Sequence, residues 1–225
     1  MHTKSFVPTK SLLGVALLAG LIACSSGFAS SKPVALPDAK LDAPAAKGDQ
    51  TAVFAGGCFW GVEAVFDHVK GVKQATAGYS GGDANTANYE TVSTGRTGHA
   101  ESVKVVYDPT KVSYGQLLKV YFSVAHDPTQ LNRQSPDSGT QYRSEIYTTN
   151  TAQQSAAKAY IAQLGAANVF PAPIVTKVEP LKAFYAAEGY HQHYLSLHPN
   201  EPYIVFNDAP KLVHLKQLFP AIYKG

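Results

Sequence analysis

The chain contains little sulfur and little excess charge. Its 225 residues include only two cysteines, Cys24 and Cys58, and one methionine, Met1. The formal net charge is +3 and no run of Lys or Arg occurs, so the charge pattern does not indicate nucleic-acid binding. Hydrophobic residues make up 45% of the sequence, which is ordinary for a globular protein and argues against global disorder.

A hydrophobic run long enough to span a bilayer is also missing. The apolar stretch at 12–23 follows Lys4 and Lys10 and is too short for a stable membrane span, but it has the length of a signal-peptide core. It ends in the sequence LIAC at Cys24. This ending resembles the lipobox of bacterial lipoproteins, in which the cysteine is lipidated and becomes the first mature residue.

The signal-like segment predicts where the protein resides. We expect residues 1–23 to be a lipoprotein signal peptide, and we expect Cys24 to hold an exported, periplasmic protein on a membrane by its lipid. Ser25, rather than Asp, follows Cys24, and lipoprotein sorting habits then favour the outer membrane. An ordinary secretory signal cleaved near Ala29, which gives a soluble periplasmic protein, is the alternative.

Cys58 is then the one thiol expected to be free in the exported protein. If Cys24 carries lipid, no intramolecular disulfide can form. Because exported domains commonly pair their cysteines, a solitary thiol is more readily explained as reactive than as structural. Loss of Met1 with the signal leaves no methionine, which suits a protein working among oxidants, although chance depletion explains it equally.

The rest of the chain divides into a tether and one domain. Residues 24–50 are rich in Ser, Ala, Pro, Lys and Asp without apolar periodicity, which predicts a flexible linker. Strand-like and helix-like segments alternate over 51–225, so we predict a single two-layer α/β domain with functional loops at 80–100 and 125–142. The predicted strands are 52–55, 72–79, 103–107, 143–148 and 174–178, the last of them before the tail. The predicted helices begin after Gly57, at Ser113 and at Thr151, and end near 70, 124 and 164.

Cys58 follows Gly56 and Gly57 and lies in the first turn of a predicted helix. Unpaired backbone N–H groups at a helix start stabilise an anion, so we expect a lowered thiol pKa. Phe59 and Trp60, the only Trp of the chain, are suited to wall an apolar pocket for a small methyl-bearing group. A buried structural cysteine is the alternative, and for Phe59 packing in the core is equally expected.

Two polar segments offer an acid and hydrogen-bond donors. Glu101 follows the sequence GRTGHA at the mouth of a predicted strand, and partial burial would raise its pKa and suit it to general-acid chemistry. The turn-rich segment at 126–144 contains Asp137 and Tyr142 and is expected to line a site. A Tyr hydroxyl there can donate to an oxygen that develops negative charge.

Three segments together resemble peptide-methionine (S)-S-oxide reductase, type A. They are GGCFWG, Tyr89-Glu90 with GRTGHAE, and PDSGTQYRS; the tail EGYHQHYLSLHPNEPYI is also similar. The resemblance covers essentially all of residues 51–225 and implies a ferredoxin-like α/β plait. It also implies thiol-dependent reduction of methionine (S)-sulfoxide, free or in proteins, and therefore repair of oxidised exported proteins.

The resemblance assigns roles to individual residues. Cys58 matches the nucleophile that attacks the sulfoxide sulfur and is left as sulfenic acid. Glu101 matches the acid that protonates the sulfoxide oxygen, and Tyr89 and Tyr142 match tyrosines that donate hydrogen bonds to that oxygen. Asp137 matches an acidic residue that helps to order the site through water.

The resemblance also bears on substrate and reductant. Phe59 and Trp60 match the pocket for the ε-methyl group of the substrate. Many family members carry a resolving cysteine in the tail, where this chain has Pro-Tyr-Ile-Val at 202–205. An external thiol, either a thioredoxin-like periplasmic protein or a small thiol, is therefore expected to reduce the Cys58 sulfenic acid. We expect a monomer with no cofactor and no metal.

Two other functions stay open at this point. His99 could pair with Cys58 in a thiol hydrolase or acyltransferase, which would act on esters or amides. A lipoprotein binding module would hold Cys58 as a structural residue. The tail also contains a group of potential metal ligands, but their spacing does not suit a metal site, and we expect them to serve packing and hydrogen bonding. These residues are Glu188, His191, His193 and His198.

Overall fold

The computed structural model describes Met1, His2 and residues 36–225. The expected lipidation site at Cys24 and nearly all of the expected signal peptide at 1–23 lie outside the described residues. Within the residues described, none of the helices has the length and apolarity that a membrane span requires.

Six strands form one mixed sheet: β1 (Gln50–Ala55), β2 (Val72–Ser80), β3 (Ala100–Tyr107), β6 (Glu145–Thr148), β7 (Lys177–Pro180) and β8 (Phe184–Ala186). Their order across the sheet is β7-β6-β1-β3-β2-β8. All neighbouring pairs are antiparallel except β6 and β7, which are parallel. Most residues of β1 and β3 are buried, which explains why these strands lie in the middle of the sheet.

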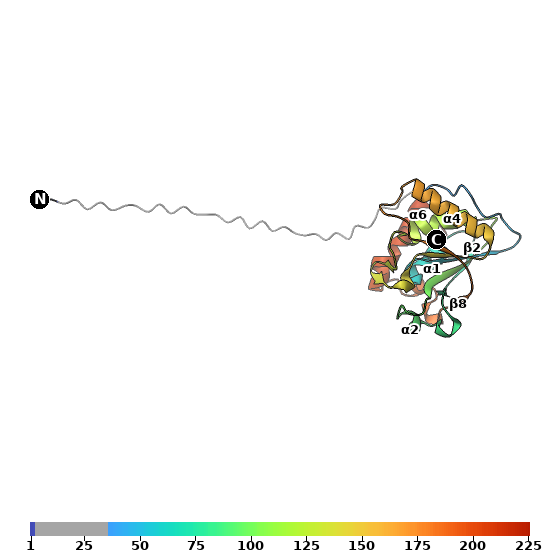
Figure 1. Cartoon of the computed structure of the whole chain (residues 1–225), viewed down its shortest axis with the longest axis horizontal. Coiled ribbons are helices and arrows are strands. Elements are labelled where there is room, and N and C mark those ends of the chain that lie inside the picture. The colour runs from blue at the N-terminus through green and yellow to red at the C-terminus, as the bar shows by residue number, and fades with distance from the viewer. Residues whose placement is uncertain (3–35) are drawn as a thin grey trace. The chain divides into compact units, whose positions relative to one another are not determined.

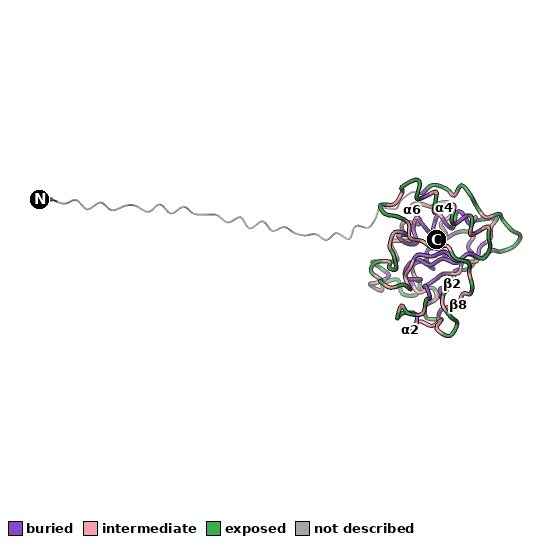
Figure 2. The backbone as a smooth tube through the Cα atoms, viewed as in Figure 1, coloured by how far each residue is buried: buried purple, intermediate pink, exposed green. Residues whose placement is uncertain are grey.

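The helices are α1 (Phe59–Asp67), α2 (Tyr89–Val92), α3 (Tyr114–Val120), α4 (Thr151–Ala166), α5 (Tyr194–Leu197) and α6 (Ala209–Leu218). In Figure 1, α4 and α6 lie at one end of the domain, and α2 and β8 lie at the other. Aromatic side chains pack against one another in the core. The ring of Phe54 stacks on the rings of Phe66 and Tyr121, with 5.0 Å between the ring centroids in each pair. The buried backbone, purple in Figure 2, runs through the interior of the domain.

The central part of the domain is a ferredoxin-like plait. The main elements follow one another along the chain as β1-α1-β2-β3-α3-β6. In the sheet, the four central strands lie in the order β6-β1-β3-β2, and all of their contacts are antiparallel. The predicted α/β plait is therefore confirmed, and β7 and β8 extend the sheet at its two edges.

The helix ends differ in detail from the predictions. Asn150, rather than Thr151, is the N-cap of α4, and its side chain accepts a hydrogen bond from a backbone N–H of the first turn. Ser113 caps α3 as predicted, in a capping box with Gln116. The predicted continuation of this helix to Val124 is present, but residues 121–125 form wider π-helical turns.

The tail departs further from the predictions. The strand predicted at 174–178 begins later, as β7, and it is not the last strand, because β8 follows and pairs with β2. Helix α6 is not predicted from the sequence. Its first turn contains Pro210, which fits a helix start, but its apolar residues do not form a regular stripe that marks a helix.

Residues 36–43 lie against the domain, and we call them the N-terminal strap. Leu36 is 3% exposed and belongs to the hydrophobic core. The side chain of Asp42 accepts a hydrogen bond from the backbone N–H of Gly115 at 2.7 Å, near the start of α3. The folded part of the chain therefore begins upstream of the predicted boundary at Thr51.

Candidate active site

Cys58 lies between β1 and α1, directly after Gly56 and Gly57, and it is the N-cap residue of α1. Gly57 has a φ of 89°, which is a left-handed conformation that favours glycine. A Cβ atom at Gly57 would lie 2.7 Å from the Cβ of Gln134. The glycine therefore lets the chain turn out of the sheet and lets the loop that carries Gln134 pack against that turn.

A cavity of about 260 Å³ opens at Cys58. Sites for drug-sized ligands measure roughly 300–1,000 Å³, so this cavity suits a single amino-acid side chain. Every catalytic and substrate-binding residue nominated from the sequence lines it, together with two residues of the tail. The lining residues are Cys58, Phe59, Trp60, Tyr89, Glu101, Asp137, Tyr142, Glu201 and Tyr203. The fold thus brings the nominated residues together, and their roles stay predictions.

Glu101 places a buried carboxyl group in this cavity. It lies on β3, is 3% exposed, and accepts a hydrogen bond from the backbone N–H of Phe59 at 3.0 Å. Burial raises the pKa of Glu101 to about 8, and the negative charges of Asp137 and Asp208 act in the same direction. The carboxyl group therefore retains its proton at neutral pH, as a general acid must.

The expectation of a lowered thiol pKa at Cys58 is wrong. Burial raises the pKa of the thiol well above its ordinary value, and the charges of Glu101 and Asp208 raise it further. A hydrogen bond from the backbone N–H of Trp60 opposes this effect but is too weak to reverse it. The N–H of Phe59, at the same helix start, is directed to Glu101 instead.

Two tyrosines line the cavity from separate segments. Tyr89 begins α2, and its backbone N–H donates to the carboxylate of Glu188 at 2.9 Å, which fixes this turn to the tail. Tyr142 ends the short 3-10 turn Thr140–Tyr142. Burial raises the pKa of both phenols, so each hydroxyl group stays protonated and can donate a hydrogen bond to a substrate oxygen.

Asp137 lies on the two-residue strand β5 (Asp137–Ser138), and burial raises its pKa. The hydroxyl group of Tyr203 donates a hydrogen bond to its carboxylate. Tyr203 and Glu201 are site residues that sequence reasoning missed, although both lie in the tail segment NEPYI that carries the family resemblance. Their position in that motif was the signal that could have found them.

Trp60 is held by aromatic neighbours from the tail. Its ring stacks on Tyr194 with centroids 3.8 Å from each other and planes inclined by 9°. Its indole N–H donates to Nδ1 of His191 at 3.1 Å. These contacts fix the indole at the cavity wall, where Phe59 also contributes an apolar surface.

A buried ion pair adjoins the first turn of α1. The Lys211 ammonium group lies 2.9 Å from Oδ1 of Asp208, and Asp208 is 1% exposed. A Cβ atom at Gly61 would lie 2.1 Å from that same oxygen, so only glycine leaves room for the pair. Sequence reasoning missed this pair, because neither residue belongs to a quoted motif.

The histidines weighed as alternatives have other partners. His99 does not line the cavity; its Nδ1 accepts from the N–H of Gly82 at 3.2 Å, and its Nε2 lies 3.0 Å from the carbonyl oxygen of Asp83. Both ring nitrogens of His99 therefore form hydrogen bonds with backbone groups. This arrangement does not support His99 as a base that activates Cys58. In the tail, His193 pairs with Asp67 at 2.9 Å.

Comparison with known proteins agrees with this geometry. Residues 50–221 match the family model described as peptide methionine sulfoxide reductase. The chain is 64% identical over 183 residues to peptide methionine sulfoxide reductase MsrA 2 of Mesorhizobium japonicum, which covers 81% of this chain and 94% of that relative. It is 50% identical over 202 residues to MsrA 2 of Synechocystis sp., which covers 88% and 94%.

Solved structures give the same result. The chain resembles methionine sulfoxide reductase A of Corynebacterium diphtheriae with a TM-score of 0.60 and 38% identity, over 68% of this chain and 77% of that one. It resembles reduced Mxr1 of Saccharomyces cerevisiae with a TM-score of 0.62 and 32% identity, over 68% and 87%.

Proposed function

The chain belongs to the peptide methionine sulfoxide reductase family and reduces methionine sulfoxide, and we propose that Cys58 is the residue that takes up the oxygen. One observation carries this proposal. A buried thiol, a carboxyl group with a raised pKa and two phenol hydroxyl groups line one small cavity. A sulfoxide needs these groups, because its sulfur is a poor electrophile until the oxygen is protonated or strongly hydrogen-bonded.

The first step concerns the sulfoxide oxygen. At neutral pH both Glu101 and Cys58 hold their protons, because burial raises the pKa of each. Glu101 transfers its proton to the sulfoxide oxygen, and the hydroxyl groups of Tyr89 and Tyr142 donate hydrogen bonds to it. Asp137 accepts a hydrogen bond from the Tyr203 hydroxyl group and helps to order the cavity around the sulfoxide oxygen.

The second step forms the bond to sulfur. Sγ of Cys58 attacks the sulfoxide sulfur, and the thiol proton passes to the Glu101 carboxylate that the first step produced. The bonds from the substrate sulfur to its oxygen and to Sγ then both break as the hydroxyl group passes to Sγ. Cys58 is left as sulfenic acid, and the substrate sulfur keeps the electron pair and leaves as methionine. The sulfoxide gains the two electrons that the thiol loses, so thiol and sulfoxide become sulfenic acid and thioether.

Substrate selection follows from the cavity walls. Phe59 and the fixed indole of Trp60 offer an apolar surface for the ε-methyl group. With the methyl group on this wall and the oxygen at Glu101, only one sulfoxide epimer directs its sulfur at Cys58. The family resemblance identifies this epimer as S, in free methionine sulfoxide or in proteins.

The oxidised enzyme needs a thiol from outside the chain. Cys58 is the only cysteine among residues 36–225, so no second thiol of the folded domain can form a disulfide with it. A first external thiol displaces water from the sulfenic acid and forms a mixed disulfide. A second thiol releases Cys58 and leaves as the disulfide of the reductant. We propose a thioredoxin-like protein or a small thiol as this reductant, and a monomeric enzyme.

The place of action is also a proposal. The apolar segment that ends at Cys24 supports export and attachment by lipid to a membrane facing the periplasm, the outer membrane in preference. Replacement of Cys24 by Ser is expected to move the protein from the membrane fraction to the soluble periplasmic fraction. Equal amounts of the wild type and of Cys24→Ser in the membrane fraction would contradict the lipid anchor.

The proposed chemistry is tested with separated epimers of a methionine sulfoxide peptide and dithiothreitol as reductant. The wild type is expected to reduce the S epimer and to leave the R epimer unchanged. The variant Cys58→Ser is expected to fold and to reduce neither epimer. Reduction of the R epimer alone, or full activity of Cys58→Ser, would contradict the proposal.

A further inference from the structure

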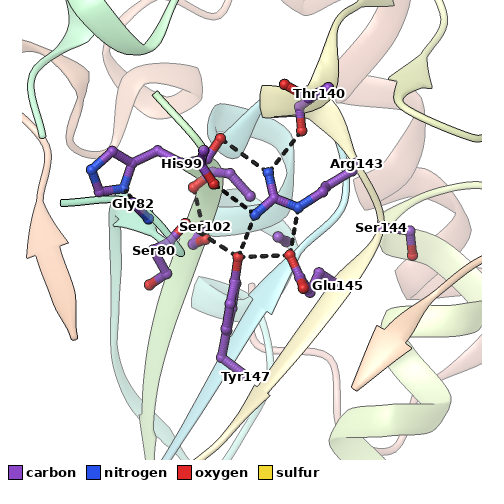
Figure 3. A network of polar contacts seen from close by, with 12 residues as sticks. Ser80, Gly82, His99, Ser102, Thr140, Arg143, Ser144, Glu145 and Tyr147 are labelled. Atoms are coloured by element: carbon purple, nitrogen blue, oxygen red, sulfur yellow. Dashed lines mark hydrogen bonds and ion pairs between the residues drawn. The ribbon is translucent and has the colours of Figure 1, made fainter. Parts of the chain in front are cut away.

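The guanidinium group of Arg143 forms a hydrogen bond through every one of its donors (Figure 3). Nε donates to the carboxylate of Glu145 at 2.5 Å, and Nη2 donates to the hydroxyl group of Tyr147 at 2.8 Å. The remaining N–H groups donate to the carbonyl oxygens of Gly98 at 3.0 Å, His99 at 3.1 Å and Thr140 at 3.0 Å. Arginine alone has five N–H donors in a rigid fork, so only arginine can make this set of contacts.

Three of these contacts join the two loops that hold the oxygen-binding groups. Thr140 begins the short turn that ends at Tyr142, directly before Arg143. Gly98 and His99 lie immediately upstream of β3, which carries Glu101. The guanidinium group therefore connects the turn of Tyr142 to the strand of Glu101 through backbone carbonyl groups on both sides.

The other two contacts fix the guanidinium group itself. Glu145 is 4% exposed, and the hydroxyl group of Tyr147 donates to the same carboxylate at 2.7 Å. A Cβ atom at Gly81 would lie 2.7 Å from Nη2 of Arg143 and 2.6 Å from the Tyr147 hydroxyl oxygen, so glycine at this position leaves room for both. The guanidinium group is thus held by Glu145 and Tyr147, two buried residues of β6, and it fits because Gly81, directly after β2, has no side chain.

We propose that Arg143 is a positioning residue for the reduction of methionine sulfoxide, which sets the separation between the Tyr142 hydroxyl group and the Glu101 carboxyl group across the cavity. The proposal rests on the function proposed above. Arg143 does not line the cavity, so it acts through its neighbours rather than on the substrate. Lysine keeps the positive charge beside Glu145 but cannot bridge the carbonyl groups of both loops.

The test compares Arg143→Lys with two matched variants. Arg96→Lys makes the same chemical change at an exposed arginine of the loop before β3. Ile146→Val removes one methyl group from the buried core of β6 and controls for loss of stability. For each variant, kcat and KM for the S epimer are measured with dithiothreitol over a range of pH, and thermal unfolding is followed by circular dichroism.

Arg143→Lys is expected to lower kcat by roughly 10- to 100-fold with a smaller change in KM, because reacting groups lose their alignment. A loosened turn admits water to Glu101 and so lowers the pKa of this acid. The variant is therefore expected to lose activity at a lower pH than the wild type as pH rises. Asp137 and Asp208 also raise the pKa of Glu101, and these variants leave both residues unchanged. Arg96→Lys and Ile146→Val are expected to keep the kcat and the pH profile of the wild type.

Two results are informative in different ways. If Arg143→Lys keeps the wild-type kcat and pH profile and loses only thermal stability, as Ile146→Val does, Arg143 is structural and the proposal is overturned. If the wild-type enzyme itself fails to reduce the S epimer, the proposed function fails instead. The wild-type assay therefore separates the two claims.

Discussion

The backbone N–H of Phe59 donates to the side chain of Glu101 at 3.0 Å, so the start of α1 is coupled to the acid on β3. The N–H groups at a helix start stabilise negative charge. Here one of them is directed at the carboxyl group, and the adjacent Cys58 thiol remains buried with a raised pKa. Both groups therefore hold their protons at neutral pH, as the proposed mechanism requires.

Glu101 is expected to control the alkaline limb of activity. Its pKa is about 8, so the fraction of protonated acid falls as pH rises above that value. Activity (kcat/KM) for the S epimer should then decline tenfold per pH unit on this limb. Glu101→Gln should lower kcat by roughly 10²–10⁴-fold and remove the limb. An unchanged limb in Glu101→Gln would assign it to another group.

The same carboxyl group is expected to make stability depend on pH. Its pKa is raised from 4.5 to about 8 in the folded state, so the folded protein binds more protons than the unfolded chain between these values. The free energy of unfolding should therefore fall as pH rises from about 4.5 to 8. Glu63, with a pKa of about 7, acts in the same direction. Urea unfolding should show a shallower decline for Glu101→Gln than for the wild type.

Asp208 is expected to suppress the reactivity of the resting thiol. Its charge raises the pKa of Cys58, and Lys211 opposes it. Asp208→Asn removes the negative charge and leaves the positive one, so the pKa of Cys58 should fall. Alkylation by iodoacetamide at pH 7 should become roughly 3- to 10-fold faster, which corresponds to a pKa change of about half a unit to one unit.

The control for this prediction is Asp38→Asn. Asp38 also pairs with a lysine, at 2.8 Å, but it is an exposed residue of the N-terminal strap and does not affect the pKa of Cys58. Circular dichroism should show that Asp208→Asn remains folded at the temperature of the assay. An alkylation rate equal to that of Asp38→Asn would exclude the proposed influence of Asp208.

The N-terminal strap is expected to stabilise the domain through one side chain. Leu36 is buried in the hydrophobic core, whereas Leu41 of the same segment is 48% exposed. Leu36→Ala should lower the free energy of unfolding by about 2–4 kcal/mol, and Leu41→Ala should change it by less than about 0.5 kcal/mol. Urea unfolding of both variants checks this, and equal effects would show that the strap is not specifically docked.

The sequence predicts the residues of the site better than their ionisation. Gly-Gly before a helical pattern predicts the position of Cys58, and the loops with Glu101 and Tyr142 are recognisable by their motifs. Local sequence does not show that the thiol is buried or that Asp208, 150 positions downstream, places a carboxylate near it. The direction of the Cys58 pKa was therefore mistaken, because tertiary burial outweighs the effect of the helix start.

The limits of the fold prediction have a similar cause. The central strands and helices have regular apolar patterns and are predicted within a few residues. The tail contributes Tyr203, the Asp208–Lys211 pair and α6, but its aromatic and polar residues show no clear period. The N-terminal strap likewise has the composition of a linker, and only its contact with the core gives Leu36 a fixed place.

The most direct test of the account is a single turnover without reductant. The enzyme is mixed with an excess of the S epimer, treated with a reagent that traps sulfenic acid, and analysed by mass spectrometry. The account predicts one methionine released per chain and one trapped sulfenic acid, located at Cys58. Release of methionine while Cys58 remains an unmodified thiol would contradict it.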